Sequence, residues 1–332
     1  MRTRRGLLFR ILKWGGLTVL VVLLMLVFLV LPYWAANAVT TVGTRPMDRE
    51  LTSTPADYGI EFEDVNFSAT DGVALRGWYL GGGYRGVSIV CAHGLFRSRR
   101  EVLGRGALLR ESGFNVLLLD SRRHGESGGD RVTIGVKERF DVQGGIDFIR
   151  ERQPEDQIIL FGVSMGAAAS LLAAAERPEV VAVIADSSFL TLEQVVTAYM
   201  DLLFGLPRFP LGDVLLFFME RRGGFQKEDL STEPAVRGIG DRPILFLGGS
   251  EDREAPPEVQ RTLHAAATSE ASNVVIFEGA THGASYRTQT DAYRAALLDF
   301  LDRATSASPN ADEENEGTKR LDRAGAAAES SP

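Results

Sequence analysis

The chain has little cysteine and little histidine, and this narrows the chemistry it can perform. Among its 332 residues there are one cysteine and four histidines. A lone cysteine cannot form an internal disulfide, and no group of cysteines and histidines has the spacing of zinc ligands. Cys91 stands in the apolar run of residues 87–92, where we expect a buried, unreactive thiol. The sequence therefore calls for no metal and no organic cofactor.

An excess of positive charge is also absent. The sequence has 36 lysines and arginines against 44 acidic residues, which gives a net charge of −8. Nucleic-acid binders carry clustered basic residues, so we expect no nucleic-acid partner. Four arginines, at positions 97, 99, 100 and 105, would suit a phosphate. Such runs are usually solvated faces, and we expect an exposed helix start there.

One long stretch lacks charge altogether. Residues 14–44 contain no Asp, Glu, Lys, Arg or His. A bilayer core needs about 20 largely apolar residues in a helix, and residues 14–36 supply that length. Trp14 stands at one end and Tyr33 and Trp34 at the other, where amphipathic rings favour the headgroup region. We therefore expect residues 14–36 to contact the lipid bilayer as a transmembrane anchor.

The flanking charges predict the orientation of this anchor. Residues 1–13 carry five basic residues and no acid, which by the positive-inside rule places the N-terminus in the cytoplasm and the body of the protein outside it. The alternative is a signal peptide cleaved after Ala38, because Ala36-Asn37-Ala38 resembles a cleavage site. A typical signal core has only about 7–15 apolar residues, which favours the uncleaved anchor over a secreted product.

The remaining sequence divides into a linker, one large domain and a tail. We expect a juxtamembrane linker at residues 37–57, an α/β domain at 58–304 and a disordered tail at 305–332, which is rich in Ala, Ser, Glu and Asp. Within the domain, residues 60–67 and 73–80 are predicted to form a hairpin across Thr70-Asp71-Gly72. Further apolar runs have the character of buried parallel strands and are residues 87–92, 116–119, 158–161, 180–185, 244–247 and 274–277. Helical segments fall between or after them, at residues 101–112, 136–151, 165–176, 257–267 and 284–303. This alternation predicts a doubly wound, mostly parallel sheet with an antiparallel start.

One insertion interrupts the alternation of strands and helices. Residues 190–241 show no strand pattern but carry many bulky apolar side chains. A long structured insertion in an α/β domain usually covers the functional site. We expect a helical cap there.

The pentapeptide Gly162-Val163-Ser164-Met165-Gly166 matches the pattern G-x-S-x-G. It follows the apolar run 158–161 and precedes a helical segment, which is the strand–turn–helix context that the motif requires. The two glycines let the arms of such a turn pass closely because they lack a Cβ atom. Ser164 is therefore the candidate nucleophile.

A serine hydroxyl needs a base, and that base needs an orienting acid. His282 follows the strand at 274–277, at the sheet edge where Ser164 is also expected. His93 and His124 better suit loop-positioning roles, and His264 suits a surface position in the middle of a helix. Asp252 follows the strand at 244–247 and is the first candidate for the acid; Asp186, Glu251 and Glu254 are the alternatives.

The chain order Ser164, Asp252, His282 resembles that of the α/β-hydrolase superfamily. Within it, the sequence looks most like the membrane-anchored serine hydrolases related to Bem46-like proteins, monoglyceride lipases and serine aminopeptidases. Besides these three residues, the resemblance rests on His93-Gly94-Leu95 and on the segment from Asp120 to Ser127. It spans about residues 60–303.

The resemblance also implies an oxyanion hole. The two donors would be the backbone N–H groups of Leu95 and Met165. The sequence departs from the family at Arg123, where relatives commonly have glycine. We expect that change to affect a loop near the pocket and not the triad.

The expected activity is hydrolysis of an ester, of a lipid or another acyl-chain compound, through an acyl-enzyme on Ser164. A peptidase resembling the aminopeptidases is the alternative, and it would need an acid in the cap to hold a free amine; Glu193, Asp201 and Asp213 are available. A third possibility is a non-catalytic binding module tethered to the membrane, which would need a broken triad. None of the three triad positions is broken.

Overall fold

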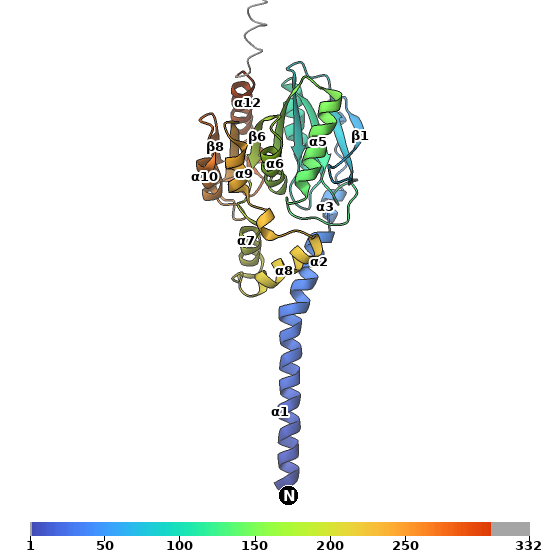
Figure 1. Ribbon diagram of the computed structural model, residues 1–332, viewed down its shortest axis with the longest axis vertical. Helices are drawn as coiled ribbons and strands as arrows, with labels where there is room; N and C mark the ends of the chain where they lie inside the picture. The colour runs from blue at the N-terminus through green and yellow to red at the C-terminus, as the bar shows by residue number, and fades with distance from the viewer. Residues whose placement is uncertain (1, 307–332) are drawn as a thin grey trace, which may run out of the picture.

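An eight-stranded sheet forms the centre of the computed structural model, which describes residues 2–306 (Figure 1). The spatial order is β1-β2-β4-β3-β5-β6-β7-β8, in which β2 pairs antiparallel with β1 and β4 and all other pairs are parallel. The strands are β1 Glu63–Ser68, β2 Ala74–Leu80, β3 Val87–Ala92, β4 Asn115–Asp120, β5 Gln157–Val163, β6 Val180–Asp186, β7 Ile244–Gly249 and β8 Asn273–Phe277. The predicted fold class, a mostly parallel sheet with an antiparallel start, is confirmed.

The central strands are buried on both faces, which is why their sequences are apolar without alternation. In β3, Val90 and Ala92 pack into the core on one face, while Ile89 and Cys91 pack into the core on the other. Cys91 is fully buried, and burial raises the pKa of its thiol well above the ordinary value. This agrees with the inert thiol that the sequence predicts.

Helices cover both faces of the sheet. One face is packed by α5 Glu138–Arg152, α6 Met165–Glu176, α9 Thr232–Ile239 and α10 Pro257–Ala266. The other is packed by α4 Leu103–Glu111, which follows the short helix η3 Arg99–Val102, and by α12 Thr290–Ser306. The last predicted helix is broken: α11 Ser285–Thr288 precedes α12, with Gln289 out of helical conformation between them. The predicted tail at 305–332 overlaps the end of α12, and from position 307 it lies outside the described residues.

The N-terminal segment is one continuous helical rod that projects from the body (Figure 1). It consists of α1 Arg2–Met25, η1 Leu26–Val30 and α2 Leu31–Thr41. Among the described residues, this region alone is helical, long and apolar enough to cross a bilayer. The chain after it is not a free linker: Thr44 and Asp48, beside and within α3 Pro46–Arg49, are buried against the body.

The insertion between β6 and β7 is helical, as predicted. It contains α7 Leu192–Phe204, α8 Leu211–Gly223, η4 Lys227–Asp229 and α9. In Figure 1, α7 and α8 lie at the end of the sheet from which the rod projects, and α8 is beside α2. The cap therefore stands between the sheet and the helical rod.

The run of arginines at 97–105 is not the exposed face that the sequence predicts. Arg99 is 2% exposed, and its guanidinium lies 4.3 Å from the centre of the Trp78 ring and pairs with Asp120 and Glu126. Arg97 pairs with Asp48 and Glu101. The expectation was wrong because most of the carboxylates that partner these arginines are distant in the sequence, at positions 48, 120 and 126.

Arg105, the last of the four arginines, is held by several buried contacts. Its Nη2 atom lies 3.0 Å from Asp186 Oδ2 and donates to the carbonyl oxygen of Gly283 at 3.1 Å. The hydroxyl of Tyr293 also donates to Asp186, at 2.9 Å. All three side chains are buried, so this cluster joins α4, β6 and α12 where solvent cannot screen the charges.

Replacing Arg105 by alanine should destabilise the protein strongly. The change leaves the buried carboxylate of Asp186 without its cation, and breaking such a pair typically costs about 3–5 kcal/mol. The measurement is the free energy of unfolding in denaturant. Arg100→Ala is the control: Arg100 is only half-buried, lies over the Trp78 ring and has no carboxylate partner within residues 2–306, so its loss should cost about 1 kcal/mol. Equal losses for the two variants would contradict a structural role for the buried pair.

Candidate active site

The sequence motif around Ser164 forms the tight turn from β5 into α6 that it predicts. Ser164 has φ 52° and ψ −113°, a conformation unfavourable for a residue with a side chain. A Cβ atom at position 162 would lie 2.2 Å from the Gly166 carbonyl oxygen, and one at 166 would lie 2.4 Å from that of Ala92. Both positions therefore require glycine. The Ser164 N–H donates to the carbonyl oxygen of Asp186 at 2.8 Å, which fixes the turn to the end of β6.

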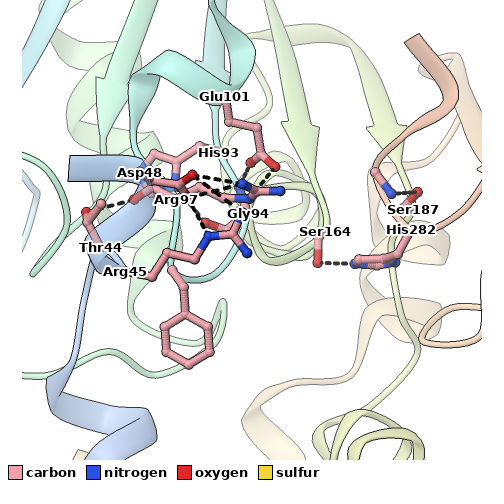
Figure 2. A network of polar contacts seen from close by, with 12 residues as sticks. Thr44, Arg45, Asp48, His93, Gly94, Arg97, Glu101, Ser164, Ser187 and His282 are labelled. Atoms are coloured by element: carbon pink, nitrogen blue, oxygen red, sulfur yellow. Dashed lines mark hydrogen bonds and ion pairs between the residues drawn. The ribbon is translucent and has the colours of Figure 1, made fainter. Parts of the chain in front are cut away.

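Ser164, His282 and Asp252 meet at the carboxyl edge of the sheet. The Nε2 atom of His282 lies 2.8 Å from Ser164 Oγ, as Figure 2 shows. Its Nδ1 atom lies 2.8 Å from Asp252 Oδ2. Asp252 is buried, and its Oδ1 atom accepts from the backbone N–H groups of Glu254 and Ala255. The side chains are thus linked in one chain of hydrogen bonds.

The other acids considered for the orienting role do not bond the Nδ1 atom of His282. Asp186 is held by Arg105 and Tyr293. Glu251 is exposed at the surface of the Asp252 loop. Glu254 Oε2 is 3.6 Å from His282 Nε2, on the side of the ring that faces Ser164, and it accepts a 2.6 Å hydrogen bond from Tyr199 of the cap.

Asp252 and Glu254 affect the charge state of the His282 imidazole. Burial disfavours the imidazolium, but the hydrogen bond and charge of Asp252, followed by the charge of Glu254, raise the pKa of His282 above its ordinary value. A ring with this environment is a stronger proton acceptor than a free histidine. The contact between Tyr199 and Glu254 could not be predicted from the sequence, because the two positions are 55 residues apart.

The loop that carries Leu95 is fixed from several sides. Burial lowers the pKa of His93 to about 4, so this ring is neutral: its Nδ1 lies 2.7 Å from the Gly94 carbonyl oxygen, and its Nε2 accepts from the Ser121 N–H. Burial likewise lowers the pKa of His124 to about 3, and its Nε2 accepts from the Phe96 N–H at 3.2 Å. The two histidines therefore hold the residues on either side of Leu95, as positioning groups.

The backbone amides of Leu95 and Met165 are placed as possible donors. Within residues 2–306, neither N–H has a hydrogen-bond acceptor. Both residues line a small cavity of about 20 Å³ with Ser164 and His282. The structure thus brings all five predicted site residues to one place.

The segment that leaves the helical rod also touches this loop, which the sequence did not indicate. The Arg45 N–H donates to the Phe96 carbonyl oxygen at 2.9 Å, and Thr44 Oγ1 donates to that of Arg97 at 2.8 Å. Asp48 Oδ1 lies 2.9 Å from Arg97 Nη1 (Figure 2). Residues 44–48 are therefore part of the wall that supports Leu95.

Other candidate residues are committed to contacts of their own. Glu193 pairs with Lys227, Asp201 with Arg253 and Asp213 with Arg208, so each cap acid already has a cation. His264 was predicted to lie mid-helix at the surface; it lies in the last turn of α10, half-buried against the Phe246 ring. In the described part of the chain, no group of three or more His, Cys, Asp or Glu side chains could hold a metal ion.

Comparisons with known proteins match most of the chain. The family model described as serine aminopeptidase, S33, matches residues 85–219, and that described as TAP-like protein matches residues 226–314. YqkD from Bacillus subtilis is 27% identical over 234 residues, which cover 70% of this chain and 76% of that protein. Protein bem46 from Schizosaccharomyces pombe is 22% identical over 301 residues, 89% of this chain and 94% of that protein.

Solved structures show the same architecture. The esterase Pf2001 from Pyrococcus furiosus superposes with a TM-score of 0.65 and 25% identity, covering 76% of this chain and 95% of that one. The α/β hydrolase GrgF from Penicillium superposes with a TM-score of 0.59 and 22% identity over 74% of this chain and 100% of that one. With the sheet order and the turn at Ser164, these matches show that the chain is a hydrolase of the α/β-hydrolase superfamily.

Proposed function

We propose that the chain is a serine hydrolase that cleaves acyl esters through an acyl-enzyme on Ser164. The observation that carries this proposal is the hydrogen-bonded series Ser164 Oγ, His282 and Asp252, with 2.8 Å at each link. Spacing of this kind lets a base remove the hydroxyl proton during attack. The strained backbone at Ser164 supports the same role, because such strain persists where the surrounding structure enforces it.

In the proposed reaction, His282 takes the proton from Ser164 as the Oγ atom of Ser164 attacks the ester carbonyl carbon. The carbonyl oxygen becomes an oxyanion, which accepts hydrogen bonds from the Leu95 and Met165 N–H groups. His282 then gives its proton to the leaving alkoxide as the ester bond breaks. A water molecule deprotonated by His282 then attacks the acyl carbonyl carbon. His282 returns that proton to the Ser164 oxygen as the acyl–oxygen bond breaks, which releases the acid and restores the serine. Asp252 holds the ring and stabilises the imidazolium throughout.

An amide substrate is the second candidate, and Glu254 is the observation that favours it. Its carboxylate lines the cavity at Ser164 and could bind the free amine of a peptide. The esters are preferred because this carboxylate is already held by Tyr199, and the three cap acids are paired. Hydrolysis of amino-acid amides but not of esters would reverse this order.

We also propose that the helical rod is an uncleaved membrane anchor with a cytoplasmic N-terminus. Cleavage after Ala38 would remove Ala36, which is fully buried and packs with the cap. It would also remove Tyr33 and Asn37, which Arg222 of α8 contacts. Losing these contacts would expose apolar surface of the cap to water, which disfavours a secreted, cleaved product.

A fluorophosphonate probe should label the wild-type protein, and Ser164→Ala should abolish the label. The same substitution should lower kcat on p-nitrophenyl esters by about 10⁴–10⁶-fold, because the nucleophile is lost. Gel fluorescence and absorbance report the two effects, and Ser170→Ala on the adjoining helix should leave both intact. A folded wild-type protein that neither reacts with the probe nor hydrolyses esters or amides would indicate a non-catalytic binding module instead.

Acyl length tests the substrate class. Across a series of p-nitrophenyl esters, kcat/KM should rise with acyl length to at least medium chains, because each buried methylene contributes about 0.8 kcal/mol. A flat or falling series would rule out acyl-chain esters as the preferred substrates.

The pH profile should depend on Glu254. His282 acts as a base only when neutral, so kcat/KM should fall as the pH drops through a pKa above the ordinary value for histidine. Glu254→Gln removes a negative charge near the ring while keeping an acceptor for Tyr199, and therefore lowers that pKa. The acidic limb of the kcat/KM profile of Glu254→Gln should therefore move to lower pH. Glu251→Gln, an exposed change on the same loop, should leave the profile unchanged, and an unmoved limb in Glu254→Gln would contradict the electrostatic argument.

A further inference from the structure

A second, apolar cavity lies beside the one at Ser164. It measures about 290 Å³ and is lined mainly by α2, α7 and α8 and by the loop that carries Leu95; its lining contains no charged side chain. Three of its lining residues belong to the end of the helical rod: Ala35, Ala38 and Val39. In Figure 1 these elements form the region where the rod meets the cap.

The two cavities share walls. Leu95, Ile134, Val195 and Tyr199 line both of them. The hydroxyl of Tyr199 is held by Glu254, so its polar end is satisfied outside the apolar space. A group bound in the apolar cavity therefore lies next to the groups around Ser164, separated from them only by these shared side chains.

The wall formed by α2 is firmly packed. The ring of Tyr33 meets that of Phe218 edge-on at 5.3 Å, and the Arg222 guanidinium donates to the Tyr33 hydroxyl at 2.9 Å. Ala36 and Thr40, on the same helix, are fully buried. These contacts fix α2 against the cap, so its side of the cavity has a defined shape.

The open end of the cavity lies among exposed apolar side chains. Leu203 and Phe204 line it and are 64% and 66% exposed. Ala35, also exposed, follows Trp34, one of the aromatic residues that we expect at the membrane interface. If the rod spans the bilayer, this opening is level with the boundary between headgroups and acyl chains.

We propose that this cavity is the acyl-chain site and that α2, the end of the membrane anchor, is one of its walls. The proposal rests on the proposed esterase function and names its substrate class: esters of long, unbranched acyl chains that enter from the membrane. An apolar cavity that adjoins the nucleophile and opens beside the rod suits such a chain, because the chain passes from lipid to protein without exposure to water. The anchor then takes part in selecting the substrate.

The test compares two substitutions on α2 in the full-length protein in detergent micelles. Ala38→Phe fills the cavity, whereas Leu31→Phe places the same ring on the exposed side of the rod. The ratio of kcat/KM for p-nitrophenyl octanoate to that for p-nitrophenyl acetate is measured for each. Excluding two methylenes at roughly fourfold each should lower the ratio at least about tenfold in Ala38→Phe. Leu31→Phe should change it less than about twofold.

Thermal unfolding reports whether each variant is folded, and Leu31→Phe, outside the cavity, should hydrolyse acetate at the wild-type rate. Should Ala38→Phe fail to fold, Val39→Ala decides: this change widens the same wall and should shift the preferred ester to longer chains. Equal ratios in Ala38→Phe and Leu31→Phe, or an unshifted preference in Val39→Ala, would overturn the proposal while leaving the esterase function standing. A wild type without any ester hydrolysis would instead remove the proposed function itself.

Discussion

The buried ion pair between Asp186 and Arg105 holds the site together. The backbone carbonyl of Asp186 receives the Ser164 N–H, and Arg105 bonds the carbonyl of Gly283, next to His282. The Gly283 N–H also donates to the Ser187 hydroxyl oxygen at 3.2 Å. The end of β6 thus sets the positions of both Ser164 and His282. A buried pair is costly unless its geometry and hydrogen bonds are good, so this one favours a single arrangement of the two loops.

The connection between the helical rod and the site is equally direct. Residues 44–48 bond the loop that carries Leu95, while α2 packs on the cap. A tether that only held the enzyme near a membrane would need neither contact. The helical rod is therefore structurally part of the hydrolase domain, and any movement of it relative to the sheet would disturb the Leu95 loop and the cap together.

The sequence predicted what is local and missed what depends on distant partners. The turn at Ser164 was predictable because glycine spacing, a preceding apolar strand and a following helix are all adjacent in the chain. Asp252 and His282 were predictable because residues that follow parallel strands gather at one edge of the sheet. The burial of Arg99 and Arg105 was not, because the carboxylates that neutralise them stand up to 81 positions away. The packing of residues 44–48 was missed for the same reason: a polar stretch beside an anchor has the composition of a linker.

A contact with the helical rod explains why the sequence departs from the family pattern at Arg123. The resemblance predicts glycine there, and the backbone agrees, since Arg123 has φ 65° in the left-handed region that glycine adopts freely. A non-glycine residue in that conformation carries strain of about 1–3 kcal/mol. Its side chain offers a compensating contact, because Nε donates to the carbonyl oxygen of Thr41 at the last turn of α2, at 2.9 Å. A Cβ atom at position 43 would lie 2.0 Å from the Arg123 carbonyl oxygen. Only glycine therefore fits at this position after α2. Arg123 and Gly43 thus both belong to the contact between the hydrolase domain and the helical rod.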